Sequence, residues 1–426
     1  MKKKQREVEV IPFEYELTDE PITGMAGLPV IMAAAKALGL EELFDEHLSI
    51  KLRKRGYSEY ELAMGVILTL LAGGENLEDA EMIRMDEVVS GGRFPHSTTV
   101  GDFLRRFDGE EIQRALVEVQ DALSRSILEA CGYSRLTLDM DATMIKAEGR
   151  KREGTGRSYN GVNGYQVLVV FAAEPGLVLA TDFRPANVHP GNGAVKLLEH
   201  TLTVIPDGTS LHLRSDSACY NKEVIGCCER KGMTFTITAD MTAPLVSRIN
   251  ALPESEWHEL TSKEQVGQLY YQPVGWERAY RYIVVRKKKG EDLFGAVYTY
   301  RAFVTNISRG KPAFLVKRHR RHANVENGIK ELKSGLSLSA MPCLAYHANR
   351  AWFGLGSIAH NLYVGMKLIF LPARWARKTI KTIRFRLLSI GGVLVRHARR
   401  KILKIPRYHP WSRELIRLRD SIVTAR

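Results

Sequence analysis

The stretch RLTLDMDAT, residues 135–143, alternates apolar and polar side chains. Successive side chains of a β-strand point to opposite faces, so Leu136, Leu138 and Met140 share one face. The other face carries Asp139 and Asp141, about 7 Å apart along the strand. Aspartate is disfavoured in strands. The pattern predicts a strand that packs one face on a core and presents two carboxylates on the other. A strand with one solvated face is the simpler interpretation.

A second acidic strand follows in LHLRSD, residues 211–216. Leu211 and Leu213 face one way, and His212, Arg214 and Asp216 face the other. Asp216 ends the strand, before a turn and a helix. Ligands of open α/β sheets bind beyond the carboxyl ends of the strands, which favours a site at Asp216. An aspartate that only forms the turn is the alternative.

A third acidic position lies in the basic segment HRRHANVENGIKELKSGL, residues 319–336. At about 100° per residue, an apolar stripe forms the predicted core face of a helix. Its members are Val325, Ile329, Leu332 and Leu336. A second stripe, a quarter turn away, contains His319, His322, Glu326, Lys330 and Lys333. Glu331 points to the opposite side. A Glu326–Lys330 pair would contribute only ~0.3–0.5 kcal/mol and would not account for the aligned histidines.

The order of the patterns predicts a mixed α/β fold. We expect a helical N-terminal domain over residues 1–130, either a DNA-binding module or a plain helical bundle. Short strands and helices alternate over residues 131–240, and tyrosine-rich β patterns over residues 241–310 predict a β-rich insertion. The α/β domain resumes over residues 311–375, and residues 376–426 form a basic C-terminal region.

The net charge of +14 is concentrated in the last part of the chain. From Lys311 onward there are 25 Lys and Arg but 4 Asp and Glu, whereas the preceding residues carry a net negative charge. Such a basic block indicates a polyanionic partner, most simply nucleic acid, with a membrane surface as the weaker alternative. The apolar residues 351–372 are interrupted by His360, Asn361 and Lys367, which predicts a buried helix and not a membrane span.

The five cysteines form no CxxC pair, and their number is odd. A zinc knuckle and a disulfide framework are therefore not expected, and a reducing cytoplasm fits best. The N-terminal lysines are not followed by an apolar run, so no signal peptide is predicted.

Three acidic positions, two on strands and one on a late helix, suit a site for phosphoryl transfer that uses two metal ions. Mg²⁺ fits such a site because it prefers oxygen ligands and keeps several of its waters. Neighbouring basic side chains would then hold the phosphates of a nucleic acid.

The segments LDMDAT, LRSDSACYNKEV and HANVENGIKELKSGLSLS resemble bacterial insertion-sequence transposases of the DDE type, in the superfamily with the YREK signature. Within that superfamily they look most similar to the IS-thirteen-eighty group. The resemblance covers residues 20 to 375 and implies an RNase H-like mixed sheet with helices on both faces. The family pattern Asp-x-Thr selects Asp141, with Thr143 two residues on and Asp139 as the alternative. Asp216 and Glu326 take the second and third places.

The YREK spacing, counted from Glu326, matches at Lys333 but has His319 and His322 in place of Tyr and Arg. The resemblance implies phosphate contacts from this segment, and Arg318 or Arg321 is expected to contribute. The expected set of phosphate-binding residues is His319, Arg321, His322, Lys330 and Lys333.

What the resemblance implies is a DNA transposase that nicks at terminal inverted repeats and joins the freed 3′-hydroxyl to target DNA. The expected cofactor is Mg²⁺ or Mn²⁺, as two ions, and the expected assembly on DNA is a homodimer. A catalytically inactive, transposase-derived DNA-binding protein is the alternative, and a nuclease of the same fold is a third possibility. Damage at one of the three carboxylates would favour the inactive protein, and all three are present.

Overall fold

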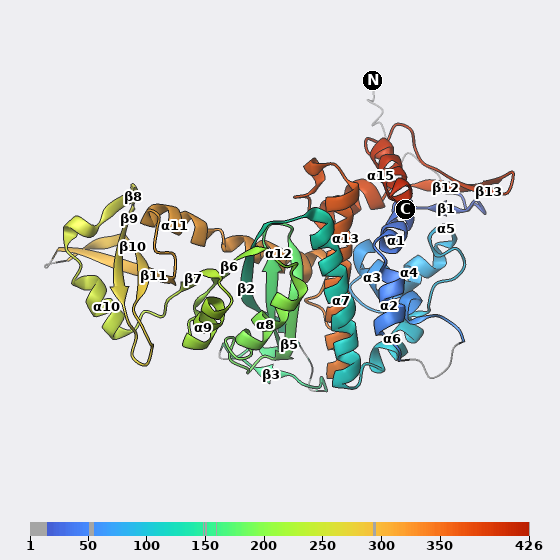
Figure 1. The fold of residues 1–426 in the computed structure, drawn as a ribbon. Helices are drawn as coiled ribbons and strands as arrows, with labels where there is room; N and C mark the ends of the chain where they lie inside the picture. Colours follow the sequence, from blue (N-terminus) through green and yellow to red (C-terminus); the bar gives the residue numbers. More distant parts are fainter. Residues whose placement is uncertain are drawn as a thin grey trace, which may run out of the picture.

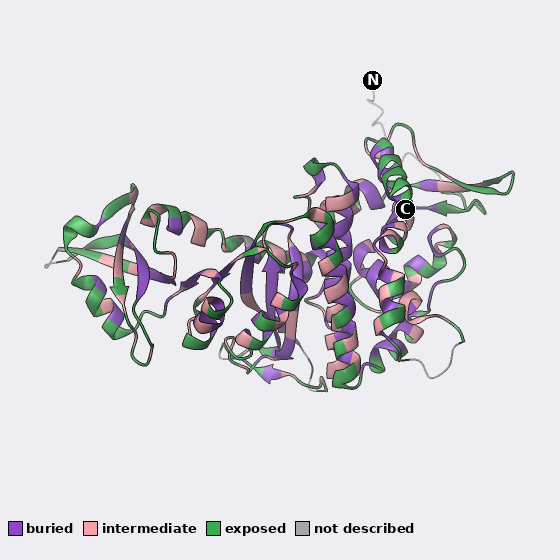
Figure 2. Cartoon of the chain, in the orientation of Figure 1, coloured by how far each residue is buried: buried purple, intermediate pink, exposed green. Residues whose placement is uncertain are grey.

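The structure, a computed structural model, describes residues 15–50, 55–147, 149, 151–158, 160–292 and 295–425. Figure 1 shows an elongated molecule with a helical part at one end, a β-sheet in the middle and a β-rich part at the other end. Buried residues follow the sheet and the helices that cover it (Figure 2). The sheet and the helical part share one continuous hydrophobic core.

The N-terminal part consists of a short strand and helices α1 to α7. Their bounds are Ile22–Thr23 (β1), Leu28–Ala37 (α1), Leu40–His47 (α2), Glu59–Ala72 (α3), Ala80–Met85 (α4), Glu87–Ser90 (α5), Ser97–Arg105 (α6) and Glu110–Cys131 (α7). A capping box between Ser58 and Glu61 starts α3, and nearly all of that helix is buried. Together α3 and α7 supply much of the helical core.

The apolar segment near residue 360 forms the long helix α13 (Tyr346–Phe370). It packs lengthwise on α7 and also contacts α3 and β5 (Leu177–Pro185). Asn361 is fully buried and exchanges hydrogen bonds with the backbone of Val178, so this polar interruption of the helix is satisfied inside the protein. The predicted buried helix is confirmed. Among the described helices, none is long and apolar enough to cross a membrane.

The centre of the sheet has the strand order β5-β4-β2-β6-β7. The bounds are Arg135–Lys146 (β2), Gly156–Arg157 (β3, paired with β4), Asn163–Ala172 (β4), Ser210–Ser215 (β6) and Thr234–Thr238 (β7). The strands β2, β4 and β5 are antiparallel, while β6 and β7 run parallel to β2. Three antiparallel strands followed by two parallel strands form the RNase H-like mixed sheet that the sequence predicts, so the predicted fold class is confirmed.

Helices cover both faces of this sheet. Helix α8 (Ala194–Val204) packs on β4 and β5, and α9 (Lys222–Arg230) packs on β7. On the face that carries Asp139, the ring of Phe171 in β4 lies against Gly328 and His360. A side chain at Gly328 would collide with that ring, so the glycine permits the close approach of its helix to the sheet.

The tyrosine-rich segment extends the same sheet. Its bounds are Ala243–Asn250 (α10), His258–Thr261 (β8), Glu264–Tyr271 (β9), Tyr280–Asp292 (β10) and Gly295–Thr305 (β11). Strand β11 pairs with β7, which gives a ten-stranded sheet that ends in β10, β9 and β8. The predicted β-rich segment is therefore continuous with the central sheet, and a small second core lies between it and the following helix.

Residues 319–336 do not form the single helix that the periodicity predicts. Helix α11 (Pro312–Arg320) ends, a turn follows at Arg321 and His322, and α12 (Ala323–Lys330) passes into a π-helical turn, η3 (Glu331–Gly335). The predicted core face is confirmed, because its four apolar side chains, Val325, Ile329, Leu332 and Leu336, are all buried. The hydrophobic stripe lies entirely after the turn, in α12, η3 and Leu336, whereas the polar stripe is divided between two helices.

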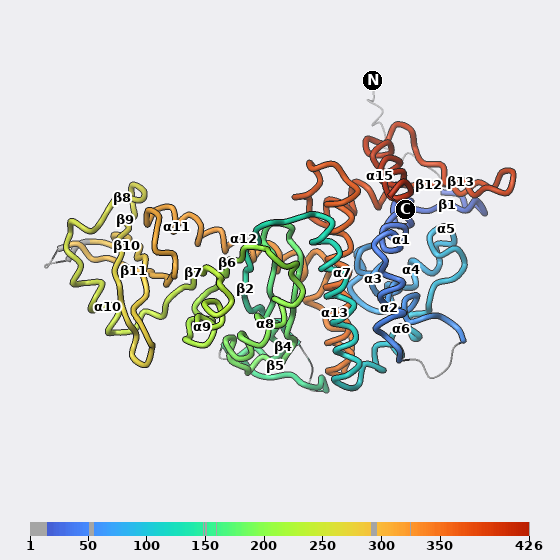
Figure 3. The backbone as a smooth tube through the Cα atoms, in the orientation of Figure 1, coloured from blue at the N-terminus to red at the C-terminus, as the bar shows by residue number. Residues whose placement is uncertain are grey.

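The C-terminal residues return to the N-terminal helices (Figure 3). Their elements are Ala373–Trp375 (η4), Ile380–Ile383 (α14), Arg384–Leu388 (η5), Gly392–His397 (β12), Arg400–Lys404 (β13) and Ser412–Thr424 (α15). Strand β1 pairs with β12, and α15 packs on α1. Gly27 lies so close to the backbone of Leu387 and Leu388 that no side chain fits there. The basic C-terminal region thus completes the helical part.

Candidate active site

Two of the three acidic positions lie side by side on neighbouring strands. Strands β2 and β6 are parallel, with Asp139 opposite Arg214 and Met140 opposite Ser215. Asp141 and Asp216 each come one residue further along, at the end of the paired region. Asp216 also starts a short 3₁₀ helix, where its carboxylate accepts a hydrogen bond of 3.0 Å from the backbone N–H of Ala218. The strand register therefore brings the first two carboxylates together.

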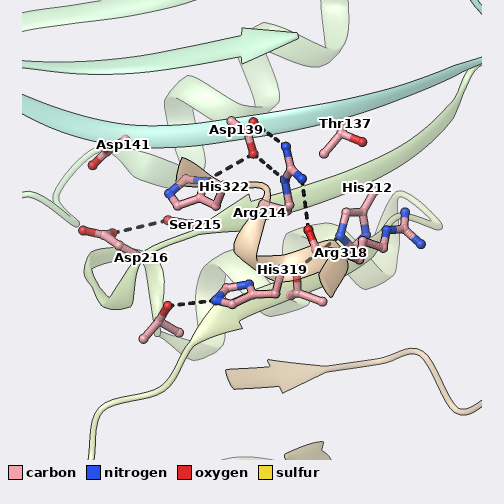
Figure 4. A network of polar contacts seen from close by, with 12 residues as sticks. Thr137, Asp139, Asp141, His212, Arg214, Ser215, Asp216, Arg318, His319 and His322 are labelled. Carbon is pink, nitrogen blue, oxygen red and sulfur yellow. Dashed lines mark hydrogen bonds and ion pairs between the residues drawn. The ribbon is translucent and has the colours of Figure 1, made fainter. Parts of the chain in front are cut away.

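Asp139 is buried in the interior of the protein. It is 1% exposed, and its two oxygens accept hydrogen bonds of 2.6 Å from Nε and Nη2 of Arg214. Nδ1 of His322 lies 3.2 Å from the same carboxylate, and Arg214 also donates to the carbonyl of Arg318. Figure 4 shows these contacts between β2, β6 and the end of α11. Both oxygens of Asp139 are in use, and the network fixes the α11–α12 turn against the sheet.

Asp141 stands in a different environment. One of its oxygens accepts a 2.7 Å hydrogen bond from the N–H of Ala142. The pKa of this carboxyl is raised to about 6, first by burial and then by the charges of Asp216 and Glu326, while His322 and the hydrogen bond from Ala142 act in the opposite direction. The charges of Asp216 and Glu326 therefore repel that of Asp141, and a cation would relieve this repulsion.

Glu326 lies in the first turn of α12 and is exposed. Its negative charge contributes to the raised pKa of Asp141. Within the described ranges, no three His, Cys, Asp or Glu side chains are grouped so that they could hold a metal ion. The donor set still fits a hard divalent cation, because Asp141 and the two groups whose charges raise its pKa, Asp216 and Glu326, all supply carboxylate oxygens.

The basic residues predicted to bind phosphate divide into two kinds. His319 stacks on Phe303 at 4.4 Å and lies 3.1 Å from the hydroxyl of Thr238, and its pKa is lowered to about 4 by burial. Lys333 donates to the carbonyl of Met144 at 2.8 Å, and burial lowers its pKa. The side chains of His319 and Lys333 are therefore engaged in contacts within the protein.

The other members of that set differ in exposure. Arg321 and Lys330 are exposed, whereas His322 is partly buried against Asp139, with its Nε2 atom buried and without a hydrogen-bond partner. His212, which shares the face of Asp216, is buried between Thr234 and Thr236. Burial lowers the pKa of His212 to about 2, which fits a structural role.

Sequence periodicity missed the pairing of Asp139 with Arg214. Both residues were recognised as polar positions on strands, but their contact depends on β2 and β6 being neighbours. A basic residue at the matching position of the second acidic strand was the signal that could have revealed it.

Comparison with known proteins gave a family match and several structural likenesses. A family model described as "Transposase DDE domain group 1" matches residues 9–426. A search of curated proteins gave no significant match. Among solved structures, a piggyBac transposase in a synaptic complex with hairpin DNA matches with a TM-score of 0.44 and 11% identity, over 84% of this chain and 77% of that chain. The family match spans nearly the whole chain, and the protein accordingly belongs to the DDE transposases and is a DNA transposase.

Proposed function

We propose that this transposase cuts DNA at the terminal inverted repeats of its element and joins the freed 3′-hydroxyl to target DNA. Asp141, Asp216 and Glu326 are the proposed catalytic carboxylates and the proposed ligands of two Mg²⁺ or Mn²⁺ ions. The single observation that carries this proposal is that Asp141 and Asp216 follow the paired ends of β2 and β6, where the charges of Asp216 and of Glu326 on α12 both act on Asp141.

Asp141 is the first ligand in this proposal because its neighbour on the same face is occupied. Both oxygens of Asp139 already bind Arg214, whereas Asp141 accepts one backbone hydrogen bond and retains an oxygen for a ligand. When bound, divalent ions would activate the attacking oxygen and stabilise the leaving oxygen of the phosphodiester. The carboxylates would hold and orient that centre, and Asp216 would be kept in position by its bond from Ala218.

The surrounding cations have different proposed roles. Arg321 and Lys330 are exposed and are proposed to contact DNA phosphates directly. His319 and Lys333 are proposed to act mainly by fixing α11 and α12 on the sheet, through Thr238 and Met144. His322 is oriented by Asp139, and its buried Nε2 atom is the proposed contact to a phosphate oxygen next to Asp141.

The proposed assembly is a homodimer that holds both ends of the element. It is tested by the mass of the complex formed with DNA that carries one such end. We also propose the division into a helical part (1–130), a catalytic part (131–240 and 311–375), a β-rich part (241–310) and a basic part (376–426).

The reaction is tested with a labelled duplex that carries the inverted repeat flanking the gene, together with a plasmid target. Cutting and joining are expected in Mg²⁺ or Mn²⁺, and neither in excess chelator. DNA binding without either activity would favour the inactive alternative, and cutting without joining would favour a nuclease. Cutting that continues in excess chelator would exclude the proposed use of metal ions.

A further inference from the structure

The β12–β13 hairpin projects from the body of the protein. Its base is anchored by β1, through the pairs Ile22–Val393 and Thr23–Gly392. Beyond Leu394, whose N–H bonds the carbonyl of Pro21, β12 and β13 pair only with each other among the described residues, from Val395–Ile402 to His397–Arg400. Figure 1 shows the hairpin extending past the helices, and Figure 2 shows that its outer part is exposed. A two-stranded ribbon of this kind has little stability of its own, which makes a free-standing tip unusual without a partner.

The two residues at the tip adopt a backbone conformation that is unfavourable for their side chains. Ala398 and Arg399 have φ angles of +46° and +63°, as in a type I′ turn. Such turns favour Asn and Gly, which adopt positive φ without strain. Strained residues of this kind are retained mainly where they serve a function. In place of a glycine, this turn carries a cation at its outermost point.

The outer half of the hairpin is uniformly basic. Arg396 and Lys401 are paired on one face, and Arg400 lies beside His397 on the other, with Arg399 at the tip. All five are exposed, and none has an acidic partner among the described residues. Residues 391–413 contain no Asp or Glu. Positive charge therefore projects from both faces and from the end of the ribbon.

We propose that the β12–β13 hairpin is a DNA-binding ribbon that enters a groove of duplex DNA. This inference rests on the proposed function for its biological setting, but the contact is separate from the three carboxylates. The major groove of B-DNA, about 12 Å wide, admits a two-stranded β-ribbon. Cations on both faces of the ribbon would reach the phosphates on both walls of the groove, and Arg399 would point to its floor.

The distribution of apolar side chains favours DNA over a membrane. The paired Val395 and Ile402 lie nearer the base of the ribbon, whereas the tip is entirely polar apart from Ala398. Insertion into a lipid interface would place apolar or aromatic side chains at the leading end. Protection of an exposed sheet edge could use a single lysine on β13, and would not require Arg396 or Arg399.

The test is a DNA-binding titration in chelator, where no cleavage occurs, at salt concentrations from about 50 to about 300 mM. The variant replaces Arg396, Arg399, Arg400 and Lys401 with Gln. Each lost phosphate contact should lower the slope of log K against log salt by about 0.9, so a loss of roughly two or more units is expected. The matched control replaces four exposed cations with Gln: Lys196 on α8, Lys222 and Arg230 on α9, and Lys231 directly after α9. The control should keep the slope of the original protein.

A single variant separates binding from folding of the turn. Arg399→Gly relieves the backbone at the tip and removes its cation, so the melting temperature should stay or rise while the affinity for DNA falls. If the tip mattered only for folding, DNA affinity would stay unchanged, and that result would overturn the proposal. Equal slopes for the fourfold variant and the original protein would also overturn it.

The probes are a duplex of random sequence, a duplex with the inverted repeat that flanks the gene, and vesicles containing phosphatidylserine. An equal loss on both duplexes supports contact with phosphates alone, and a larger loss on the repeat supports groove reading at the transposon end. Loss of vesicle binding with unchanged DNA binding refutes the proposal. Cutting in Mg²⁺ is measured separately: if Asp141→Asn still cuts, the proposed catalytic site fails while the ribbon result stands.

Discussion

Asp139 and Arg214 form a buried, two-point ion pair between β2 and β6, with both hydrogen bonds at 2.6 Å. The pair occupies the position immediately before Asp141 and Asp216 in the register of the two strands. One pair of residues therefore joins the strands, and the next pair presents two carboxylates. This arrangement gives the two aspartates of β2 different tasks, and it predicts different consequences when each is changed.

Asp139→Asn is expected to damage stability first. It leaves the guanidinium of Arg214 buried without its counter-charge, and removing one partner of a buried ion pair costs about 3–5 kcal/mol. The free energy of unfolding, measured in urea, should fall accordingly. Residual cleavage at low temperature is expected in proportion to the folded fraction. An Asp139→Asn protein of normal stability that is inactive would instead make Asp139 the catalytic residue.

Asp141→Asn is expected to abolish cleavage while keeping or raising the stability of the protein without metal. The pKa of Asp141 is raised to about 6 in the folded protein, against an ordinary value near 3.8. The folded state therefore holds the proton more tightly, so this group's contribution to stability is complete below about pH 4 and is lost as pH rises through about 6. The difference in unfolding free energy between Asp141→Asn and the original protein should grow over that window and level off above it. A difference that does not change with pH would contradict the raised pKa.

Metal binding should appear as stabilisation at pH 7, independently of any cleavage. Mg²⁺ or Mn²⁺ that binds only the folded protein raises its melting temperature by mass action. The rise should be smaller in Asp141→Asn and in Asp216→Asn, since each lacks one ligand charge, and chelator should reverse it in the original protein. An equal rise in all three proteins would show that the ions bind elsewhere.

Glu326→Gln should leave the fold and the affinity for DNA nearly unchanged but lower cleavage by orders of magnitude. The side chain is exposed, and the buried face of α12 does not involve it. Removing a negative charge near bound phosphate reduces repulsion, so DNA affinity should stay equal or improve slightly. Cleavage is measured on labelled DNA at saturating protein.

The control for Glu326→Gln must be an exposed glutamate that holds no other part of the structure. Glu331, expected on the opposite side of the helix, accepts a hydrogen bond from the N–H of Ile380 and is partly buried. It connects η3 to α14, so a substitution there would also affect stability. Glu199→Gln on α8 is the better control, because that carboxylate is exposed. Equal losses of cleavage from Glu326→Gln and Glu199→Gln would remove Glu326 from the proposed site.

Removal of residues 376–426 should unfold much of the helical part. Buried side chains in this region belong to the main core, at Ile380, Ile383, Leu387, Leu388, Ile390, Leu415, Leu418 and Ile422. Arg384 also donates hydrogen bonds to the carbonyls of Leu70, Leu71 and Gly335. The truncated protein should show a much lower melting temperature or aggregate, whereas the fourfold hairpin variant should melt normally. A truncated protein that melts like the full chain would contradict this packing.

Local sequence patterns predicted the individual strands and helices better than they predicted which of these elements lie next to one another. The alternation in residues 135–143 correctly predicted a strand with Leu136, Leu138 and Met140 buried. The same alternation treated Asp139 and Asp141 alike, because periodicity gives only the face of a strand. Their difference comes from Arg214, which lies 75 positions away from Asp139 in the chain.

The same limit applies to the helix that carries Glu326. Its hydrophobic stripe was predicted correctly, but that stripe begins at Val325, after the turn at Arg321 and His322, and so gave no sign of the break. The break brings His322 to Asp139, a contact that no local pattern encodes. The continuation of the central sheet through β7 and β11 was likewise not predicted, since strand pairing over such a distance leaves no local signature.

The closure of the N-terminal helices by residues from the C-terminal part has a consequence for folding during synthesis. Until residues 392–424 have been synthesised, α1 has no α15 to pack on, and β1 has no β12 to pair with. Domains generally fold in the order in which they emerge from the ribosome. The N-terminal helical part, however, can complete its folding only after β12 and α15 have been synthesised. An incomplete chain would therefore have a finished central sheet beside an unfinished helical part. Synthesis through α15 is a condition for the helical part of this transposase to reach its native state.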